Sequence, residues 1–157
     1  MENLQESLPV SMKHKETAEK IKKSVLFLCT HNSARSQMAE GLLREIYGDR
    51  FDVYSAGTEP SRVNPYAIRV MEEIGIDISG QRSKNMDEFV LGDFDYVVTV
   101  CDKAKEACPV AAGGHKIIHK GFSDPSRFRG KDEEILAGFR NIRDQIRIWI
   151  EEGFSRY

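Results

Sequence analysis

The sequence predicts an α/β domain with a parallel sheet, and two observations carry this prediction. Short apolar runs typical of buried strands alternate along the chain with amphipathic segments at helical spacing. The length of 157 residues fits one domain, which can bury a core without disulfides or a structural metal. Strands separated by helices pair in parallel, and such sheets bind ligands beyond the carboxyl ends of their strands.

The first half of the domain is expected to contain two strands and two helices. The continuous apolar run at Val25–Cys29 predicts a strand covered on both faces, and apolar spacing predicts a helix over Ser33–Tyr47. A second strand is expected over Phe51–Ser55. A second helix is expected over Pro65–Ile74, with Gly75 as its stop signal.

The second half repeats the alternation. Met86–Leu91 is compatible with a short helix, and Tyr96–Cys101 (YVVTVC) predicts a third buried strand. Lys116–His119 (KIIH) is a weaker fourth strand, and Glu133–Glu152 predicts a long amphipathic helix. The loops that follow the first, third and fourth strands are therefore where chemistry is expected.

Residues 1–23 are polar and are expected to form a tail or a surface helix, with the domain over 24–157. The first residues lack an apolar run after a basic start, so no secretory signal is predicted. A net charge of −2 gives no field that would attract nucleic acid or anionic lipid, and the longest apolar runs are too short to cross a membrane. We expect a cytoplasmic protein that binds neither nucleic acid nor membranes. The odd number of cysteines (Cys29, Cys101 and Cys108) fits a reducing compartment.

A C-x5-R motif lies where the first strand should meet its helix. Cys29 ends the strand, and Arg35 follows six residues later at the start of the helix. A loop of this length can turn successive N–H groups toward one anion, the helix dipole adds to them, and the arginine offers a planar fork. The same features stabilise a thiolate at Cys29. The alternative, a small buried cysteine and a solvated arginine, does not explain the strand–loop–helix context. The expected oxyanion-binding loop comprises Thr30, His31, Asn32, Ser33, Ala34, Arg35 and Ser36.

A candidate acid follows the last predicted strand. Asp124 precedes Pro125, which holds it in an extended or turn conformation and can aim it across a site as a general acid or base. The alternative is an ordinary Asp-Pro turn.

The segment CTHNSARSQMAEG resembles the phosphate loop of the low-molecular-weight tyrosine phosphatase superfamily, and more specifically that of the thioredoxin-coupled arsenate reductases on this fold. The resemblance covers roughly Ser24–Phe154. It implies a flavodoxin-like three-layer fold with a four-stranded parallel sheet, and arsenate or a similar small oxyanion as substrate. It also implies no bound cofactor and no metal, with thioredoxin or another dithiol protein as external reductant. Asp124 would then protonate the leaving oxygen.

The resemblance also assigns roles to the other two cysteines. Cys101 is expected at the same sheet edge as Cys29, where it would attack the Cys29 adduct and expel the reduced product. Cys108 would then resolve the disulfide. Two alternatives remain open: inert thiols, and a zinc site built from Cys101, Cys108, His115 and His119. The six-residue gap between the cysteines is too wide for a usual zinc knuckle.

Several positions depart from the superfamily pattern. Ser126 stands where tyrosine phosphatases place an aromatic residue, which favours a small inorganic oxyanion. Ala34 replaces a second loop cysteine. Lys84 stands where some members have an acidic residue beside a monovalent cation, so we hypothesise that its ammonium replaces the ion. The expected supports of the loop are Asn32, Glu40, Ser55 and Lys84.

The sequence therefore predicts an arsenate reductase with a relay of three cysteines. One alternative is a low-molecular-weight phosphatase that hydrolyses phosphate monoesters through a phosphocysteine at Cys29. The other is a non-catalytic anion-binding module that kept the fold.

Overall fold

The computed structural model describes residues 21–102, 104 and 116–157. Its sheet has four parallel strands in the order β2-β1-β3-β4. The central strands are β1 (Lys23–Cys29) and β3 (Tyr96–Thr99), flanked by β2 (Phe51–Gly57) and β4 (Lys116–His119). Since all strands run in one direction, Cys29, Thr99 and His119 end at one edge of the sheet.

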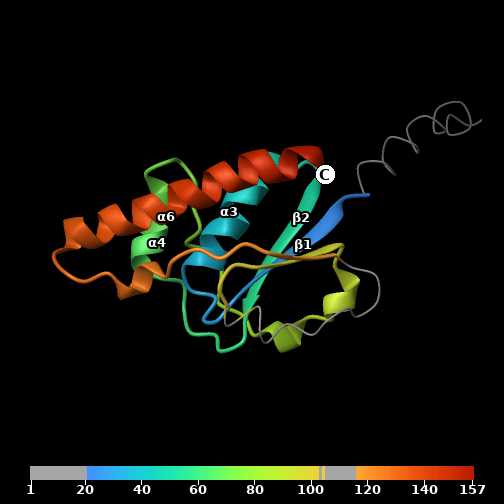
Figure 1. Cartoon of the computed structure of the whole chain (residues 1–157), viewed down its shortest axis with the longest axis horizontal. Coiled ribbons are helices and arrows are strands. Elements are labelled where there is room, and N and C mark those ends of the chain that lie inside the picture. Colours follow the sequence, from blue (N-terminus) through green and yellow to red (C-terminus); the bar gives the residue numbers. More distant parts are fainter. Residues whose placement is uncertain (1–20, 103, 105–115) are drawn as a thin grey trace, which may run out of the picture.

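Three helices lie together on one side of the sheet, as Figure 1 shows. They are α3 (Arg35–Tyr47), α4 (Pro65–Glu72) and α6 (Asp132–Gly153). Helix α6 packs on both of the others, and α3 contacts β1 and β2. The face that α6 buries includes Leu136, Phe139, Ile142, Ile146 and Ile150. Each such side chain contributes about 1.5–3 kcal/mol by leaving water.

The opposite side of the sheet carries two short 3₁₀ turns, η1 (Met86–Glu88) and η2 (Leu91–Asp93). Side chains alternate along β2, so Tyr54 points away from the α3 side, and its ring packs 5.9 Å from Phe89 and 5.6 Å from Phe94 between ring centroids. Layers on both faces of a four-stranded parallel sheet confirm the predicted three-layer α/β fold.

Several element ends differ from the sequence prediction, and four of the differences have a local structural reason. The helix expected over Met86–Leu91 is two 3₁₀ turns, because Phe89 between them is extended at φ −123° and ψ 153°. The third strand ends at Thr99 instead of Cys101, since its neighbour β4 ends at His119. Helix α4 ends at Glu72, where the turn at Gly75 (φ +81°) closes it through a bond from Ile76 N to Met71 O. Helix α3 begins at Arg35 because the preceding residues form a loop.

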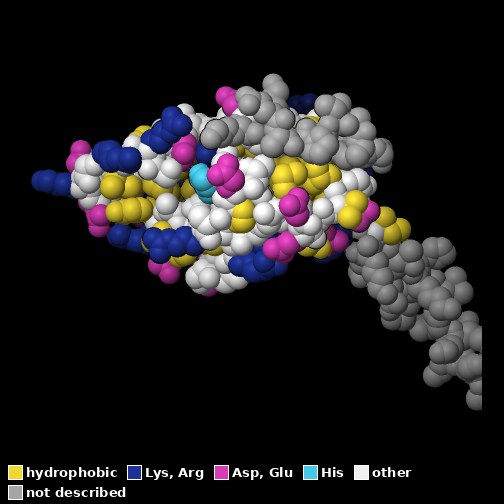
Figure 2. Space-filling model, turned by 90° about the horizontal axis from the view of Figure 1, so that it is seen from below, with side chains coloured by type: hydrophobic (Ala, Val, Ile, Leu, Met, Phe, Trp, Pro, Cys, Tyr) yellow, Lys and Arg dark blue, Asp and Glu magenta, His cyan; other side chains and the backbone are white. Residues whose placement is uncertain are grey.

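The start of the chain is only partly described. Strand β1 begins at Lys23, one residue before the predicted domain start, and residues 1–20 lie outside the described part, so the predicted tail stays a prediction. Within the described ranges, no helix is both long and apolar enough to span a membrane. Acidic and basic side chains both occur over the face seen in Figure 2.

Candidate active site

The loop after β1 turns its carbonyl groups outward. A neighbouring segment supplies the donors: backbone N–H groups of Thr58, Glu59, Ser61 and Asn64 donate to the carbonyls of Cys29, Thr30, His31 and Ser33 over 2.8–3.3 Å. With its carbonyls bonded on the outside, the loop can present N–H groups to its interior, where an anion would bind. The N–H of Thr30 already donates to the Cys29 sulfur.

Two backbone features let the loop close this tightly. Asn32 has a positive φ of 48°, which asparagine tolerates better than most residues. Gly57 lies so close behind the loop that a Cβ there would stand 2.6 Å from Thr30 O and 2.9 Å from Asn32 N. A side chain at position 57 would therefore push the loop out of shape.

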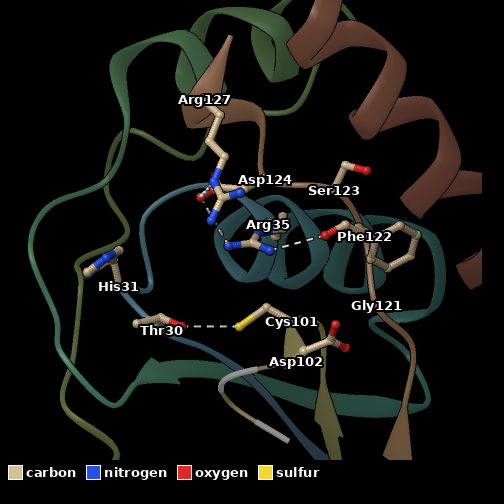
Figure 3. Close-up of a pocket in the computed structure, with 10 residues that line it drawn as sticks. All are labelled: Thr30, His31, Arg35, Cys101, Asp102, Gly121, Phe122, Ser123, Asp124 and Arg127. Atoms are coloured by element: carbon tan, nitrogen blue, oxygen red, sulfur yellow. Dashed lines mark hydrogen bonds and ion pairs between the residues drawn. The ribbon is translucent and has the colours of Figure 1, made fainter.

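Cys29 and Cys101 face each other across the mouth of this loop. Both are buried, and the interaction between their side chains shifts the pKa of each thiol. The Cys101 sulfur also lies 3.3 Å from Thr30 Oγ1 and accepts the N–H of Ala104. Figure 3 shows the Thr30–Cys101 contact at the floor of the site. The prediction that these two cysteines meet at one sheet edge is met by this geometry.

The two thiols ionise as a pair. The hydrogen bond to Cys101, with burial, raises the pKa of Cys29 well above its usual value, although the Arg35 charge acts in the opposite direction. The same hydrogen bond lowers the pKa of Cys101 to about 5 against the effect of burial. The two thiols are therefore coupled, and ionisation of one disfavours ionisation of the other.

Arg35 reaches from the start of α3 toward the segment after β4. It is buried, its Nη1 donates to Phe122 O over 3.1 Å, and its Nη2 lies 3.6 Å from Asp124 Oδ2. Figure 3 shows the guanidinium between these two partners. An oxyanion in the loop would compete with the Asp124 carboxylate for the same guanidinium face.

Ser126, which stands where tyrosine phosphatases place an aromatic residue, holds the Asp124 carboxylate in place. Both the N–H and the hydroxyl of Ser126 donate to Asp124 Oδ1, over 2.9 and 2.7 Å. Burial favours the neutral acid, but the Ser126 bonds and the charges of Arg35 and Arg127 outweigh burial and lower the pKa of Asp124. Asp124 is therefore a carboxylate at neutral pH, ready to accept a proton.

A buried polar chain ties the loop to α3 and β2. The Asn32 amide donates to Ser36 Oγ over 2.8 Å and to Ser55 Oγ over 2.9 Å, and Ser55 Oγ donates to Glu40 Oε1 over 2.5 Å. Each of these side chains is at most 5% exposed, so every lost bond would leave a polar group unsatisfied.

Lys84 completes this support from the other side. Its backbone N–H donates to Asn32 Oδ1 over 2.8 Å, and its ammonium donates to Arg82 O over 2.8 Å. The ammonium also lies 3.8 Å from Glu40 Oε1. Burial lowers the pKa of Lys84, and the Glu40 carboxylate opposes that effect. The ammonium is therefore held by Arg82 O beside the Glu40 carboxylate.

Two adjoining cavities open over these groups. The larger, of about 540 Å³, is lined by Thr30, His31, Arg35, Cys101, Asp102, Gly121, Phe122, Ser123, Asp124 and Arg127. The smaller, of about 200 Å³, is lined by Cys29, His31, Ser33, Ala34, Arg35, Ser61, Asp124 and Ser126. A tetrahedral oxyanion fits either volume, and Arg35 and Asp124 belong to both.

Comparison with known proteins agrees with this arrangement. The family model described as low molecular weight phosphotyrosine protein phosphatase matches residues 24–152, most of the chain. The chain belongs to this family. An arsenate reductase from Halalkalibacterium halodurans is 50% identical over 125 residues, which is 80% of this chain and 90% of that protein.

Solved structures of the low molecular weight phosphatase family extend the likeness. An arsenate reductase in its oxidised state superposes with a TM-score of 0.74 at 35% identity, covering 85% of this chain and 98% of that one. A thioredoxin-dependent arsenate reductase from Corynebacterium glutamicum gives a TM-score of 0.63 at 29% identity, covering 90% of this chain and 67% of that one.

Of the residues predicted for the site, one lines both cavities from an exposed position and one is not described. His31 is exposed, and its Nδ1 lies 3.0 Å from Glu59 O. Cys108 lies outside the described residues, as does His115 of the zinc alternative. Among the described residues, no group of three or more histidine, cysteine or acidic side chains is arranged to hold a metal.

Sequence reasoning missed three contributors to the site. Gln37 donates from Nε2 to Asn32 O over 3.0 Å and to Arg82 O over 2.9 Å, which joins the loop to the Lys84 segment. Phe122 contributes only its backbone carbonyl, and no pattern of side chains in the sequence could reveal that contact. Asp102 borders the larger cavity directly after Cys101, and its position next to that cysteine was the signal that could have found it.

Proposed function

We propose that this protein is an arsenate reductase, and the direct pairing of two buried thiols over an anion-binding loop carries the proposal. A phosphatase of this family needs one nucleophile, whereas reduction of an oxyanion needs a second thiol to take up oxidation. The relatives named as arsenate reductases support the same assignment.

The first step forms a bond between the Cys29 sulfur and arsenic. The loop N–H groups and Arg35 bind the arsenate oxygens, and the Asp124 carboxylate accepts the Cys29 proton as the sulfur attacks. Asp124 then passes that proton to a hydroxyl group of the arsenate, which leaves as water. The low pKa of Asp124 suits this order, because the group must begin as a base and end as one.

The second step is the reduction. The Cys101 thiolate attacks the Cys29 sulfur, the S–As bond breaks, and its electron pair stays on arsenic, which leaves as arsenite and takes protons from solvent. This step forms a Cys29–Cys101 disulfide. Its nucleophile is the Cys101 thiolate, which Thr30 Oγ1, the Ala104 N–H and the charge of Arg35 stabilise.

The third step frees the loop for another cycle. The Cys108 thiolate attacks the Cys101 sulfur, which releases Cys29 and leaves a Cys101–Cys108 disulfide. A dithiol protein of the thioredoxin type then reduces that disulfide, and the thioredoxin-dependent relative supports this choice of reductant. The scheme requires no bound cofactor.

A second candidate is hydrolysis of phosphate monoesters through a phosphocysteine at Cys29, which the family membership favours. Ser126 argues against an aromatic substrate, since its hydroxyl holds Asp124 and leaves no ring to stack on a phenyl group. The same loop would still hydrolyse simple aryl phosphates slowly.

Stoichiometry in a single turnover tests the proposal. The fully reduced protein, mixed with excess arsenate and no external reductant, should release one arsenite per chain and lose two titratable thiols. Phosphate in place of arsenate should cost no thiols. Release of no arsenite under these conditions, together with steady hydrolysis of p-nitrophenyl phosphate, would assign the protein to the phosphatases.

We further propose that Lys84 is a built-in cation for the loop. Lys84→Ala removes the ammonium, and the Glu40 carboxylate then keeps only its Arg44 and Ser55 partners. We expect activity in potassium-free buffer to fall about tenfold, in line with the roughly 1–3 kcal/mol cost of an unsatisfied buried group. Potassium should restore part of that loss by entering the vacated space.

The wild type should respond to potassium by less than about twofold, because its own ammonium already occupies the position. Lys116→Ala, at an exposed lysine on β4, is the matched control. Clear activation of the wild type by potassium would contradict the proposal that the Lys84 ammonium takes the place of a bound cation.

A further inference from the structure

His119, the last residue of β4, joins the sheet edge to the segment after Cys101. Its Nδ1 lies 2.8 Å from Thr99 Oγ1 on β3, and its Nε2 lies 3.1 Å from Asp102 Oδ1. Thr99 is buried, whereas Asp102 is exposed at the border of the larger cavity. The imidazole therefore links a fixed strand to a carboxylate next to the second thiol.

Both charge states of the imidazole can keep this link. Because a carboxylate only accepts, Nε2 must carry a hydrogen and donate it to Asp102. In the neutral ring Nδ1 accepts the Thr99 hydroxyl hydrogen, and in the charged ring Nδ1 donates to the same oxygen. The hydrogen-bonded link therefore does not depend on the charge of the ring.

The residue that His119 holds lies inside the turn that surrounds the Cys101 sulfur. Cys101, Asp102 and Ala104 lie within four positions of the sequence, and the Ala104 N–H donates to the Cys101 sulfur. A bond that fixes the Asp102 carboxylate thus fixes the turn whose N–H points at the thiolate. From the opposite side Thr30 Oγ1 contacts the same sulfur (Figure 3).

We propose that His119, through Asp102, is a positioning residue that holds the Cys101 thiolate against Cys29 for the reductive step. This inference rests on the proposed function, because the step it concerns is attack of Cys101 on the Cys29 adduct. Disulfide exchange needs the attacking thiolate in line with the sulfur it attacks, and small displacements cost large factors in rate. The first step, which Cys29, Arg35 and Asp124 carry out, does not use this link.

The test compares the two steps in full-length protein carrying Cys108→Ala, in which the Cys29–Cys101 disulfide is the final product. His119→Ala should slow single-turnover release of arsenite by about 10- to 100-fold, as expected for a displaced nucleophile. Hydrolysis of p-nitrophenyl phosphate by the same variant should not slow by more than about twofold, because it needs only Cys29, Arg35 and Asp124.

Asp102→Ala tests the same link without the risk that His119→Ala fails to fold, because the Asp102 side chain is exposed. It should slow arsenite release about fivefold or more, and Asp102→Asn should stay within about twofold of the parent because its amide oxygen still accepts from Nε2. Asp52→Ala, an exposed carboxylate near the amino end of β2, is the matched control and should change nothing.

Equal loss of both activities in His119→Ala and Asp102→Ala, or no loss of arsenite release in either, would overturn the positioning role. A second readout separates this outcome from failure of the proposed function. Formation of the Cys29–Cys101 disulfide with the oxidant diamide needs no arsenate, and it should slow in the same variants. A parent protein that releases no arsenite, yet shows slowed oxidation in these variants, would refute the reductase and keep the positioning role.

Discussion

Replacing Arg35 by lysine is expected to lower kcat/KM for arsenate roughly 100- to 1000-fold, the range found when one donor to a developing anion is removed. The guanidinium spans from Phe122 O to Asp124 and can turn its fork toward two oxyanion oxygens. A lysine ammonium keeps the positive charge but cannot bond Phe122 O and two oxyanion oxygens at the same time. Steady-state kinetics with arsenate and with p-nitrophenyl phosphate should show similar losses.

Arg129→Lys makes the same chemical change at an exposed arginine and should leave both activities within about twofold of the wild type. An Arg35→Lys enzyme with near-normal kcat/KM would mean that the loop N–H groups alone bind the oxyanion. In that case Arg35 would have only its structural bond to Phe122 O.

Cys101→Ala is expected to abolish release of arsenite while p-nitrophenyl phosphate hydrolysis continues. Without the second thiol the Cys29 adduct has no internal reductant, so the reaction stops after its first step. The substitution also removes the hydrogen bond that most raises the pKa of Cys29, so the Cys29 thiolate should form at lower pH than in the wild type. Hydrolysis should therefore gain activity on the acidic side of its pH profile.

Thiolate absorbance in a Cys108→Ala background gives an independent check of the coupled pair. The parent should form one thiolate at about pH 5, and Cys29→Ala should shift the Cys101 titration upward because its main stabilising bond is lost. Two thiols that titrate alike with or without each other would contradict the pairing. Arsenite release by Cys101→Ala at the parental rate would remove Cys101 from the reaction.

The sequence predicted the fold because its pattern is strong where burial is complete. Val25–Leu28 lie in the central strand with no exposed surface, so the run had to be apolar throughout. The prediction weakened where local hydrogen bonds compete with regular structure. Asn85 accepts the Asp87 N–H, and this bond favours a 3₁₀ turn at Met86–Glu88 over the expected helix.

The candidate site was predictable where a residue type at a given position has few possible functions. A cysteine at a strand end, with an arginine six residues on, indicated the anion loop that the structure places there. The coupling of the thiols was not predictable, because loop chemistry alone favours a thiolate at Cys29 and cannot weigh a second sulfur beside it. Which of two sulfurs keeps a shared proton depends on contacts between segments far apart in the chain.

The contact between His119 and Asp102 was also not predictable from the sequence. A histidine at the end of a strand and an aspartate after a cysteine are common, and only the parallel pairing of β3 with β4 brings them together. The zinc alternative used the same histidine, whose ring contacts Thr99 and Asp102 in the described part of the structure.

The proposed relay begins at Cys29, passes to Cys101 and ends at Cys108, with thioredoxin restoring the thiols. Arsenate-dependent oxidation of NADPH, with thioredoxin and thioredoxin reductase supplied, tests it most directly in the wild type and in Cys108→Ala. We expect continuous turnover by the wild type and a single stoichiometric event in the variant. Equal continuous turnover by both proteins would contradict the relay, and no arsenate-dependent oxidation by either would contradict the reductase itself.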